Sequence, residues 1–218
     1  MTDLAALLLA LVRYNLVMTL AAIAIALPIA CLFAAGRLSA NPLVRYPTTA
    51  YVNVLRSSPL VMIMFWVYTV APLLTGRPSS AYASALFALA AFEVAYFTEI
   101  IRSGIQSISA GQRQAALATG LTEGQVTRLV VLPQALRRMM PSLLTQSLIA
   151  LQDSTIASVI SVPEILQTTS VINAREQNPI FLYSSLAVIY FAVCYGLSLT
   201  VRRLERASRV RTGLARGT

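Results

Sequence analysis

Three carboxylates stand inside long apolar stretches of the sequence, where ionisable side chains are rare. They are Glu93, Glu99 and Asp153. A charge at membrane depth costs about 2.5–3.5 kcal/mol on insertion scales, so such groups usually belong to a substrate path, a proton relay or an ion pair. Glu99 lies three residues before Arg102, on the same helical face. We predict that these two residues form either an ion pair near the membrane surface or a gate at the inner mouth of a pathway.

Further polar side chains surround Asp153. Positions 142, 146, 149 and 153 recur at helical spacing, so Ser142, Gln146 and Asp153 share one broad stripe of a predicted helix. Such a stripe is too polar to face lipid. It either joins neighbouring helices by hydrogen bonds or lines a substrate pathway. We predict a pathway, formed by Glu93, Gln146, Gln152, Asp153, Ser154 and Thr155.

The cations of this chain exclude several kinds of chemistry. All 17 are arginine, and the sequence has no lysine and no histidine. A phosphate-binding P-loop needs its lysine, and a Ser-His or Cys-His catalyst needs an imidazole. We therefore expect neither an enzyme nor an ATPase, and no metal or cofactor bound by this chain. The arginines lie between apolar runs, where cations set membrane orientation, so nucleic acid is not an expected partner.

The composition places these residues in a membrane protein. Hydrophobic residues make up 57% of the 218-residue chain and charged residues 11%, with a mean hydropathy of +0.70. Unpaired backbone cannot cross lipid, so the spanning elements must be helices. The sequence predicts one all-α transmembrane domain over residues 1–218. Its five spans, each long enough for a bilayer core of about 30 Å, are residues 14–35, 57–75, 81–101, 139–160 and 180–201.

Arginine positions predict how these spans are oriented. With the N-terminus outside and the C-terminus inside, fourteen arginines lie in inner segments and three, Arg13, Arg77 and Arg175, lie outside. The inner set includes six arginines of the tail, from Arg202 to Arg216. An excess of cations in cytoplasmic loops favours this orientation. The apolar residues 4–12 are too few to span, and we expect a separate helix there along the membrane surface.

One inner segment, residues 102–138, contains residue patterns that predict helix ends and a turn. Residues 111–119 are rich in alanine, and Gly120 follows them where a left-handed C-terminal cap is expected. Thr122 and Gln125 then form a capping-box pattern that begins a second helix. Pro133, which has no backbone N–H, is expected to break or kink that helix. The segment is predicted to be two short helices with a sharp turn, a shape suited to docking.

The same residues carry a resemblance to a known family. Residues 111–120, GQRQAALATG, followed by VLP at 131–133, resemble the EAA loop of permease subunits of ABC importers. Residues 53–60 and 96–105, NVLRSSPL and YFTEIIRSGI, are similar to permeases of the histidine/glutamine type for polar amino acids. The glutamate/aspartate branch is the most similar, through AFEVAY at 91–96, QSIS at 106–109 and QDST at 152–155. Gln114 stands where the motif has its glutamate, so the charge of that position is lost.

The resemblance implies a fold, partners and a set of coupling residues. It implies the MetI-like fold of type I importers, in the bacterial cytoplasmic (inner) membrane, with a coupling helix in the cytoplasmic loop. The implied partners are a second permease subunit, homologous or identical, two ATPase subunits that bind ATP and magnesium, and an extracytoplasmic solute-binding protein. The residues implied to contact the ATPase are Gly111, Gln114, Ala115, Ala116, Gly120, Leu132 and Pro133.

The expected function is one half of the pathway of an ATP-driven importer for glutamate or aspartate. Alternatives stay open, because the ionisable groups in mid-span are acidic and by electrostatics suit a cationic or other polar amino acid. A proton-coupled secondary carrier, with Glu93 or Asp153 as its proton site, is a second class. A third is a structural membrane subunit without a pathway.

An outer helix is also expected after the fourth span. Ser161 and Glu164 form a second capping-box pattern with Pro163 in the first turn, which predicts a short helix over 163–171. It would act either as a simple connector or as a lid or contact for the binding protein.

Overall fold

The computed structural model of the chain describes residues 2–76, 78 and 80–211, and in this part every regular element is helical, as expected. Arg77 and Arg216, which enter the arginine count above, lie outside the described residues. The elements, in chain order, are α1 (Thr2–Ala10), η1 (Leu11–Leu16), α2 (Val17–Arg37), α3 (Pro42–Arg56), α4 (Leu60–Thr75), α5 (Ala81–Gln106), α6 (Ala110–Ala118), α7 (Glu123–Gln125), η2 (Val126–Val131), α8 (Leu132–Asp153), η3 (Ser154–Ile160), α9 (Ile165–Glu176) and α10 (Pro179–Arg211).

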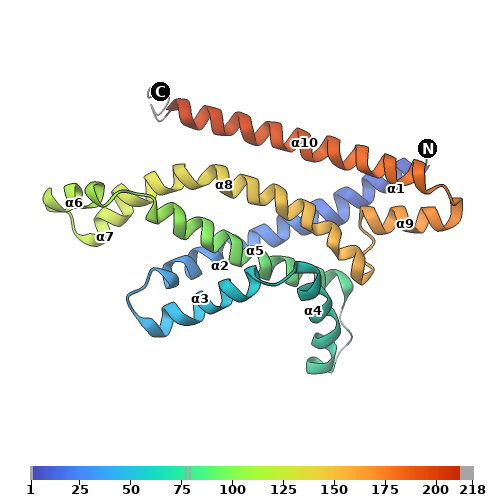
Figure 1. Ribbon diagram of the computed structural model, residues 1–218, viewed down its shortest axis with the longest axis horizontal. Coiled ribbons are helices and arrows are strands. Elements are labelled where there is room, and N and C mark those ends of the chain that lie inside the picture. The colour runs from blue at the N-terminus through green and yellow to red at the C-terminus, as the bar shows by residue number, and fades with distance from the viewer. Residues whose placement is uncertain (1, 77, 79, 212–218) are drawn as a thin grey trace.

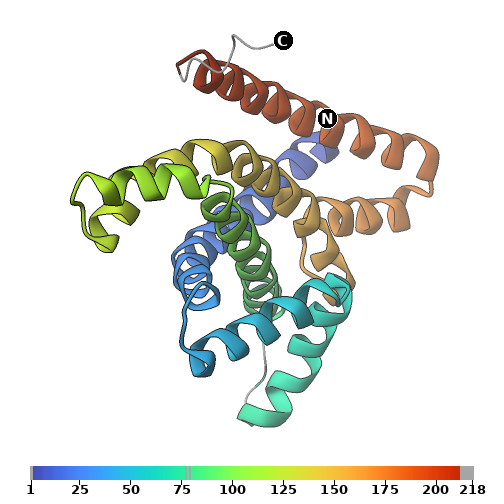
Figure 2. The ribbon, with the colours of Figure 1, turned by 60° about the vertical axis from the view of Figure 1, so that its left-hand side comes forward.

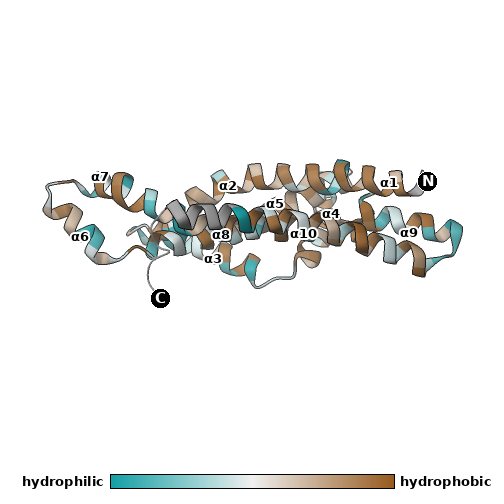
Figure 3. Ribbon diagram, turned by 90° about the horizontal axis from the view of Figure 1, so that it is seen from above, coloured by the Kyte–Doolittle hydropathy of each residue, from teal (hydrophilic) through white to brown (hydrophobic). Residues whose placement is uncertain are grey.

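The long helices run roughly side by side, and the short ones lie at the two ends. The hairpin of α6 and α7 projects at one end, while α1 and α9 lie at the other (Figures 1 and 2). The beginning of α1 and the end of α10 lie at opposite ends of the molecule (Figure 1). Hydrophobic residues dominate the middle, and hydrophilic residues gather mostly near α6 and around α9 (Figure 3).

Helix α5 is the centre of the packing, since it contacts α2, α3, α4 and α8. Small residues make these contacts close. Ala22, Ala26, Ala30 and Ala34 recur every four residues on α2 and are fully buried. They pack with α5 residues such as Phe97, which is also fully buried. In a membrane, where lipid tails are as apolar as leucine, small side chains drive helix association by letting backbones approach.

Among the described residues, four helices are long and apolar enough to cross a membrane, or five if the bent pair α3–α4 is one span. The pair is bent by 106° where Ser57–Pro59 separate the two helices. The predicted span 57–75 is therefore wrong in its beginning, because Pro59 ends the bend and α4 starts at Leu60. With 16 residues, α4 is about 24 Å long and shorter than a bilayer core.

Several helices extend beyond the spans and segments predicted from the sequence. Residues 4–12 do not form a separate surface helix, because one helix continues from Leu4 to Arg37 through the π-helical η1. Helix α5 passes the predicted end at 101 and reaches Gln106, and α10 passes 201. Hydropathy marks where the apolar stretch ends, whereas a helix ends only where its backbone is capped or broken. Arginines near a membrane surface can stay in the helix because their long side chains reach water.

The predicted turn and capping box of the α6–α7 hairpin are confirmed. Helix α6 spans Ala110–Ala118, and Gly120 follows in the left-handed region with φ of +86°. The Thr122 hydroxyl accepts from the backbone N–H of Gln125, whose side-chain oxygen accepts from the Thr122 N–H at 2.9 Å, which completes the capping box.

The break at Pro133 was predicted wrongly. From Glu123 to Ile160 the structure is one helical run, so the second helix of the hairpin is not separate. Pro133 lies in the first turn of α8, directly after the π-helical η2. The backbone changes from π-helical to α-helical geometry just before Pro133, and the helix continues.

The predicted capping box of Ser161 and Glu164 was wrong as well, although a helix does follow. Ser161 adopts a left-handed conformation with φ of +64° at the end of η3. Glu164 is itself the N-cap of α9, and its carboxylate accepts from the backbone N–H of Gln167 at 2.8 Å. The helix runs from Ile165 to Glu176, later than the 163–171 expected.

The contact of α5 with α8 depends on Gly104. A Cβ atom at Gly104 would lie 2.9 Å from Met139 Cβ, so the helices would have to move apart. We expect Gly104→Ala to lower the free energy of unfolding by about 1–3 kcal/mol, the usual cost of overpacking. Unfolding by denaturant in detergent measures this.

Gly196→Ala on α10 is the matched control, because a Cβ there would meet no atom within 4 Å. It should leave stability unchanged or raise it by up to about 1 kcal/mol. Equal losses in both variants would contradict a special role for the close approach at Gly104.

Candidate functional site

A polar contact joins α5 and α8 in the middle of the molecule. Glu93 is fully buried, and its two carboxylate oxygens accept from Gln146 Nε2 at 3.1 and 3.3 Å. Asp153 lies seven residues beyond Gln146 on the same face of α8 and is half-buried. We call this line of polar groups, Glu93, Gln146 and Asp153, the α5–α8 seam. The structure thus brings Glu93 and Gln146, two of the six residues predicted for a pathway, into contact, and it places Asp153 two turns further along the same face of α8.

The other three predicted pathway residues have different surroundings. Gln152 is exposed, and Thr155 donates its hydroxyl to the Gln152 carbonyl at 2.7 Å. Ser154 is fully buried, on the side of the chain that meets the first helix. It donates to the Leu151 carbonyl at 2.7 Å and accepts from Asn15. The change from α8 to the 3-10 helix η3 after Asp153 directs these consecutive residues to different sides.

Asn15 is a buried polar residue that the sequence analysis missed. Its Nδ2 donates to Ser154 Oγ at 2.9 Å and to Glu164 Oε2 at 3.1 Å. Its Oδ1 accepts from the backbone N–H of Ile165 at 3.2 Å. One amide therefore joins the first helix, η3 and the start of α9. The rule that identified Glu93, a polar group inside an apolar stretch, also applies to Asn15.

Glu164 completes this cluster at the start of α9. It is fully buried, and it accepts hydrogen bonds from Asn15 and from the backbone of Gln167. Burial raises the pKa of the Glu164 carboxyl, while the bonds from the backbone and from Asn15 act in the opposite direction. The helix N-terminus also favours a negative charge here. The carboxylate holds α9 against the membrane helices through these contacts.

A second charged cluster lies toward the α6–α7 end of α5. Glu99 forms ion pairs with Arg102, as predicted, and also with Arg37 of α2. Arg56, at the end of α3, lies 3.8 Å from the same carboxylate. No local spacing predicts the Arg37 contact, because 62 residues separate it from Glu99. Three helices thus meet at one carboxylate, with Arg37 and Glu99 13% and 22% exposed.

The residues expected to contact an ATPase divide into exposed and buried sets. Gly111, Gln114 and Ala115 are exposed on α6, and Gly120, Leu132 and Pro133 are exposed as well. Ala116 differs, since it is buried against Val126 and Val131. It therefore holds the hairpin together instead of adding to its surface. An ion pair of Arg113 with Glu123 also closes the hairpin.

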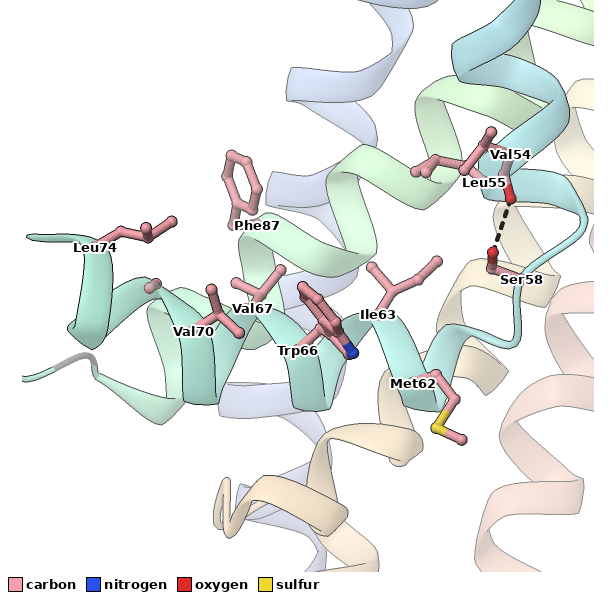
Figure 4. A pocket seen from close by; sticks show the side chains of 11 residues that line it. Val54, Leu55, Ser58, Met62, Ile63, Trp66, Val67, Val70, Leu74 and Phe87 are labelled. Atoms are coloured by element: carbon pink, nitrogen blue, oxygen red, sulfur yellow. Dashed lines mark hydrogen bonds between the residues drawn. The ribbon is translucent and has the colours of Figure 1, made fainter.

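An apolar groove of about 590 Å³ runs along α4. Figure 4 shows Met62, Trp66, Val70 and Leu74 on α4, with Phe87 across from them and Val54 on α3. Ser58 contributes a hydroxyl, but it donates to the Val54 carbonyl at 2.8 Å. No charged side chain lines this groove. It offers nothing to recognise a charged substrate, and the α5–α8 seam remains the candidate site.

Comparison with known proteins identifies the family. A family profile described as "Binding-protein-dependent transport system inner membrane component" matches residues 26–210. The glutamate/aspartate import permease protein GltK of Escherichia coli O157:H7 is 39% identical over 199 residues, covering 88% of this chain and 89% of that protein. The probable glutamine ABC transporter permease protein GlnP of Bacillus subtilis (strain 168) is 42% identical over 159 residues, covering 71% and 72%.

Solved structures agree with this result. A crystal structure of an amino acid ABC transporter with histidines matches with a TM-score of 0.86 and 27% identity, covering 91% of this chain and 94% of the other. An inward facing conformation of the MetNI methionine ABC transporter matches with a TM-score of 0.75 over 95% of this chain and 97% of the other. At 19% identity, the second match shows the fold alone.

The Asn15 cluster yields a test of stability. Asn15→Leu keeps a similar side-chain volume but leaves Ser154, Glu164 and the Ile165 N–H without this partner. We expect the free energy of unfolding to fall by about 1–3 kcal/mol, the cost of leaving buried polar groups unsatisfied. Thr19→Val is the matched control on the same helix, because the Thr19 hydroxyl is buried and has no hydrogen-bond partner in the described structure. A loss in Thr19→Val as large as in Asn15→Leu would contradict this explanation.

The Glu99 cluster yields a second test. Glu99→Gln leaves Arg37, Arg56 and Arg102 without their shared carboxylate. We expect a loss of about 1–3 kcal/mol in unfolding free energy, below the 3–5 of a fully buried pair because water reaches this site. Glu123→Gln removes the same charge from an ion pair whose side chains are over half exposed, and it should cost about 0–1 kcal/mol. The prediction is wrong if the two variants are equally stable.

Proposed function

The chain belongs to the family of binding-protein-dependent transport system inner membrane components, and we propose that it forms one half of the membrane pathway of an importer for glutamate and aspartate. It is a non-catalytic permease subunit of an amino acid ABC importer, whose ATPase is a separate subunit. Its fold is the all-helical, MetI-like fold of type I permeases.

One observation carries the choice of substrate. The glutamate/aspartate import permease covers nearly the whole chain at 39% identity, whereas the more identical glutamine relative covers less of it. The carboxylates of the α5–α8 seam act in the other direction, because they attract a cation. A cationic residue on the second permease subunit would offset them for an acidic substrate. The comparisons give no support to the alternative of a proton-coupled carrier.

The proposed topology has five spans, with α3 and α4 as one broken span. The N-terminus is outside and the C-terminus inside, so the α6–α7 hairpin lies in the cytoplasm. This agrees with the arginine distribution and with the opposite ends reached by α1 and α10 (Figure 1). The chain then crosses the bacterial inner membrane several times, as members of an inner membrane component family do.

Coupling to ATP is proposed to use the exposed side of α6. Gly111 and Ala115 present little side chain there, so a groove of an ATPase can approach the helix backbone closely. Gln114 offers a hydrogen bond in place of the motif's charge. Gly120 fixes the turn, and Leu132 and Pro133 lie on the exposed surface of α8 behind it. Two ATPase subunits that bind ATP and magnesium, a second permease subunit and a solute-binding protein are the proposed partners.

Transport is proposed to follow the α5–α8 seam by alternating access. Glu93, Gln146, Gln152, Asp153 and Thr155 are the proposed pathway residues, and Ser154 supports them from its buried position. Glu99 and Arg102 are proposed to act as a structural ion pair, because the additional contact with Arg37 holds α2 and α5 together at that depth.

Reconstituted transport tests the substrate. The permease, its partner permease and the ATPase are placed in proteoliposomes with the binding protein, and uptake of acidic, neutral and basic amino acids is measured. We expect ATP-dependent uptake of glutamate and aspartate that a protonophore leaves unchanged. Uptake of basic amino acids alone would refute the acidic substrate. Collapse with a protonophore while ATP is maintained would instead indicate a secondary carrier.

Ala115→Leu tests the coupling surface in the same preparation. A bulky side chain on the exposed face of α6 should weaken ATPase docking about tenfold, since overpacking costs about 1–3 kcal/mol. Binding-protein-stimulated ATP hydrolysis and uptake should fall together. Ala24→Leu makes the same change at an exposed position in the middle of α2 and should have little effect. Normal stimulated hydrolysis in Ala115→Leu would exclude this docking surface.

A further inference from the structure

A polar cleft lies between α5 and α8 near the α6–α7 end of the molecule. Its volume is about 360 Å³. The hydroxyl-bearing residues Ser103 and Ser107 line it from α5, and Ser142 and Arg138 line it from α8. Gly104 and Met139 also line it, where α5 and α8 approach closely. We call this space the inner cleft. The proposed topology places it at the cytoplasmic end of the permease.

The inner cleft continues the α5–α8 seam. On α5, Gly104 and Ser107 follow Glu93 by eleven and fourteen residues, which returns to the same helical face. On α8, Ser142 precedes Gln146 by four residues, again on one face. A solute that moves along the seam from Asp153 past Glu93 therefore reaches the inner cleft next, before it enters the cytoplasm.

Among the described residues, Arg138 has no counter-ion for its charge. Its guanidinium donates one hydrogen bond, from Nη1 to the Ser107 backbone carbonyl at 2.5 Å. Within the part of the chain that the structure describes, no carboxylate lies within ion-pair distance of it. A carbonyl is a neutral acceptor, so the positive charge and the remaining N–H donors of Arg138 are available to a ligand.

Among the described residues Arg128 and Arg137 also lack an ion pair, but of these three arginines only Arg138 lines the inner cleft. Arg37, Arg56 and Arg102 share the carboxylate of Glu99, and Arg113 pairs with Glu123. Arg138 instead faces a cleft in which Ser103 and Ser107 donate to the Ile100 and Gly104 carbonyls, while the Ser142 hydroxyl has no partner among the described residues. A planar guanidinium beside the hydroxyl of Ser142 is an arrangement that suits carboxylate or phosphate oxygens.

We propose that the inner cleft binds the carboxylate of the transported amino acid as it leaves the pathway, with Arg138 as its counter-ion. This rests on the proposed function, because it requires an amino acid to reach the cytoplasmic end of the seam. The carboxylate is common to all amino acids, so the site does not depend on which one is transported. A phosphate of an inner-leaflet lipid has the same oxyanion chemistry, and the experiment must distinguish the two.

The test places a thiol in the cleft of the complete transporter in proteoliposomes. Cys31 and Cys194 are replaced by alanine, and Ser142→Cys is the reporter, with Ser107→Cys as a second reporter if the first does not assemble. Modification rates are compared for an anionic and a cationic methanethiosulfonate reagent. We expect the anionic reagent to be favoured, and Arg138→Gln to lower that preference about fivefold. Arg137→Gln removes the neighbouring charge, does not line the cleft and should change the preference little.

Protection of the cysteine reporter by added ligands shows which oxyanion, a carboxylate or a lipid phosphate, binds in the inner cleft. Glutamate on the cytoplasmic side should slow modification. Glutaminamide, whose α-carboxyl group is also an amide and which therefore has no carboxylate, should not slow it. A reagent preference that Arg138→Gln leaves unchanged overturns the proposal. Slowing by anionic lipid but not by glutamate overturns it too, since the ligand is then a lipid phosphate. Uptake is measured in parallel: if amino acids are taken up but do not protect, only the cleft proposal fails, and if none is taken up, the proposed function fails.

Discussion

A polar group inside a membrane must find its partner within the protein, because lipid offers none. This constraint organises the packing of the present chain. Glu93 is satisfied by Gln146, Glu99 by arginines of three helices, and Asn15 by Ser154, Glu164 and the backbone of α9. Each set joins segments that are far apart in the sequence. Polar pairs thus specify which helices lie next to each other, whereas the alanines of α2 allow close packing without selecting a particular partner.

The polar sets lie at different depths, and this separates their roles. The Asn15 set fixes α9 and η3 at one end, and the Glu99 set fixes α2, α3 and α5 toward the other. Between them, the α5–α8 seam has a single side-chain hydrogen-bonding pair, Glu93 with Gln146, and a half-buried Asp153 without a basic partner among the described residues. The two ends are therefore fastened more firmly than the middle. A seam that must open for a solute is best placed where the fewest strong contacts have to be broken.

Local features were predictable from the sequence, and non-local ones were not. The Gly120 turn and the Thr122 capping box depend on neighbours within a few residues, so their residue types alone predicted them. The shared face of Gln146 and Asp153 followed from helical spacing, and Glu93 was identified as a carboxylate inside an apolar stretch. The contact of Arg37 with Glu99 could not be predicted, since it arises only when α2 and α5 pack. The capping box predicted at Ser161 was wrong because the backbone of Ser161 ends the preceding helix, and no spacing rule predicts this.

The charge along α5 and α8 links two properties of the transporter that are usually considered apart, its substrate and its second permease subunit. If the partner is a second copy of this chain, the carboxylates of the seam are doubled around the pathway, and a cation is the solute that they attract. A homologous partner with a cation at that depth would cancel them and admit an acidic amino acid. For the proposed seam, an acidic substrate is therefore better matched by a heterodimeric permease pair, and a cationic one by a homodimer. The proposed role of Arg138 fits both cases, because every amino acid has a carboxylate for it to bind.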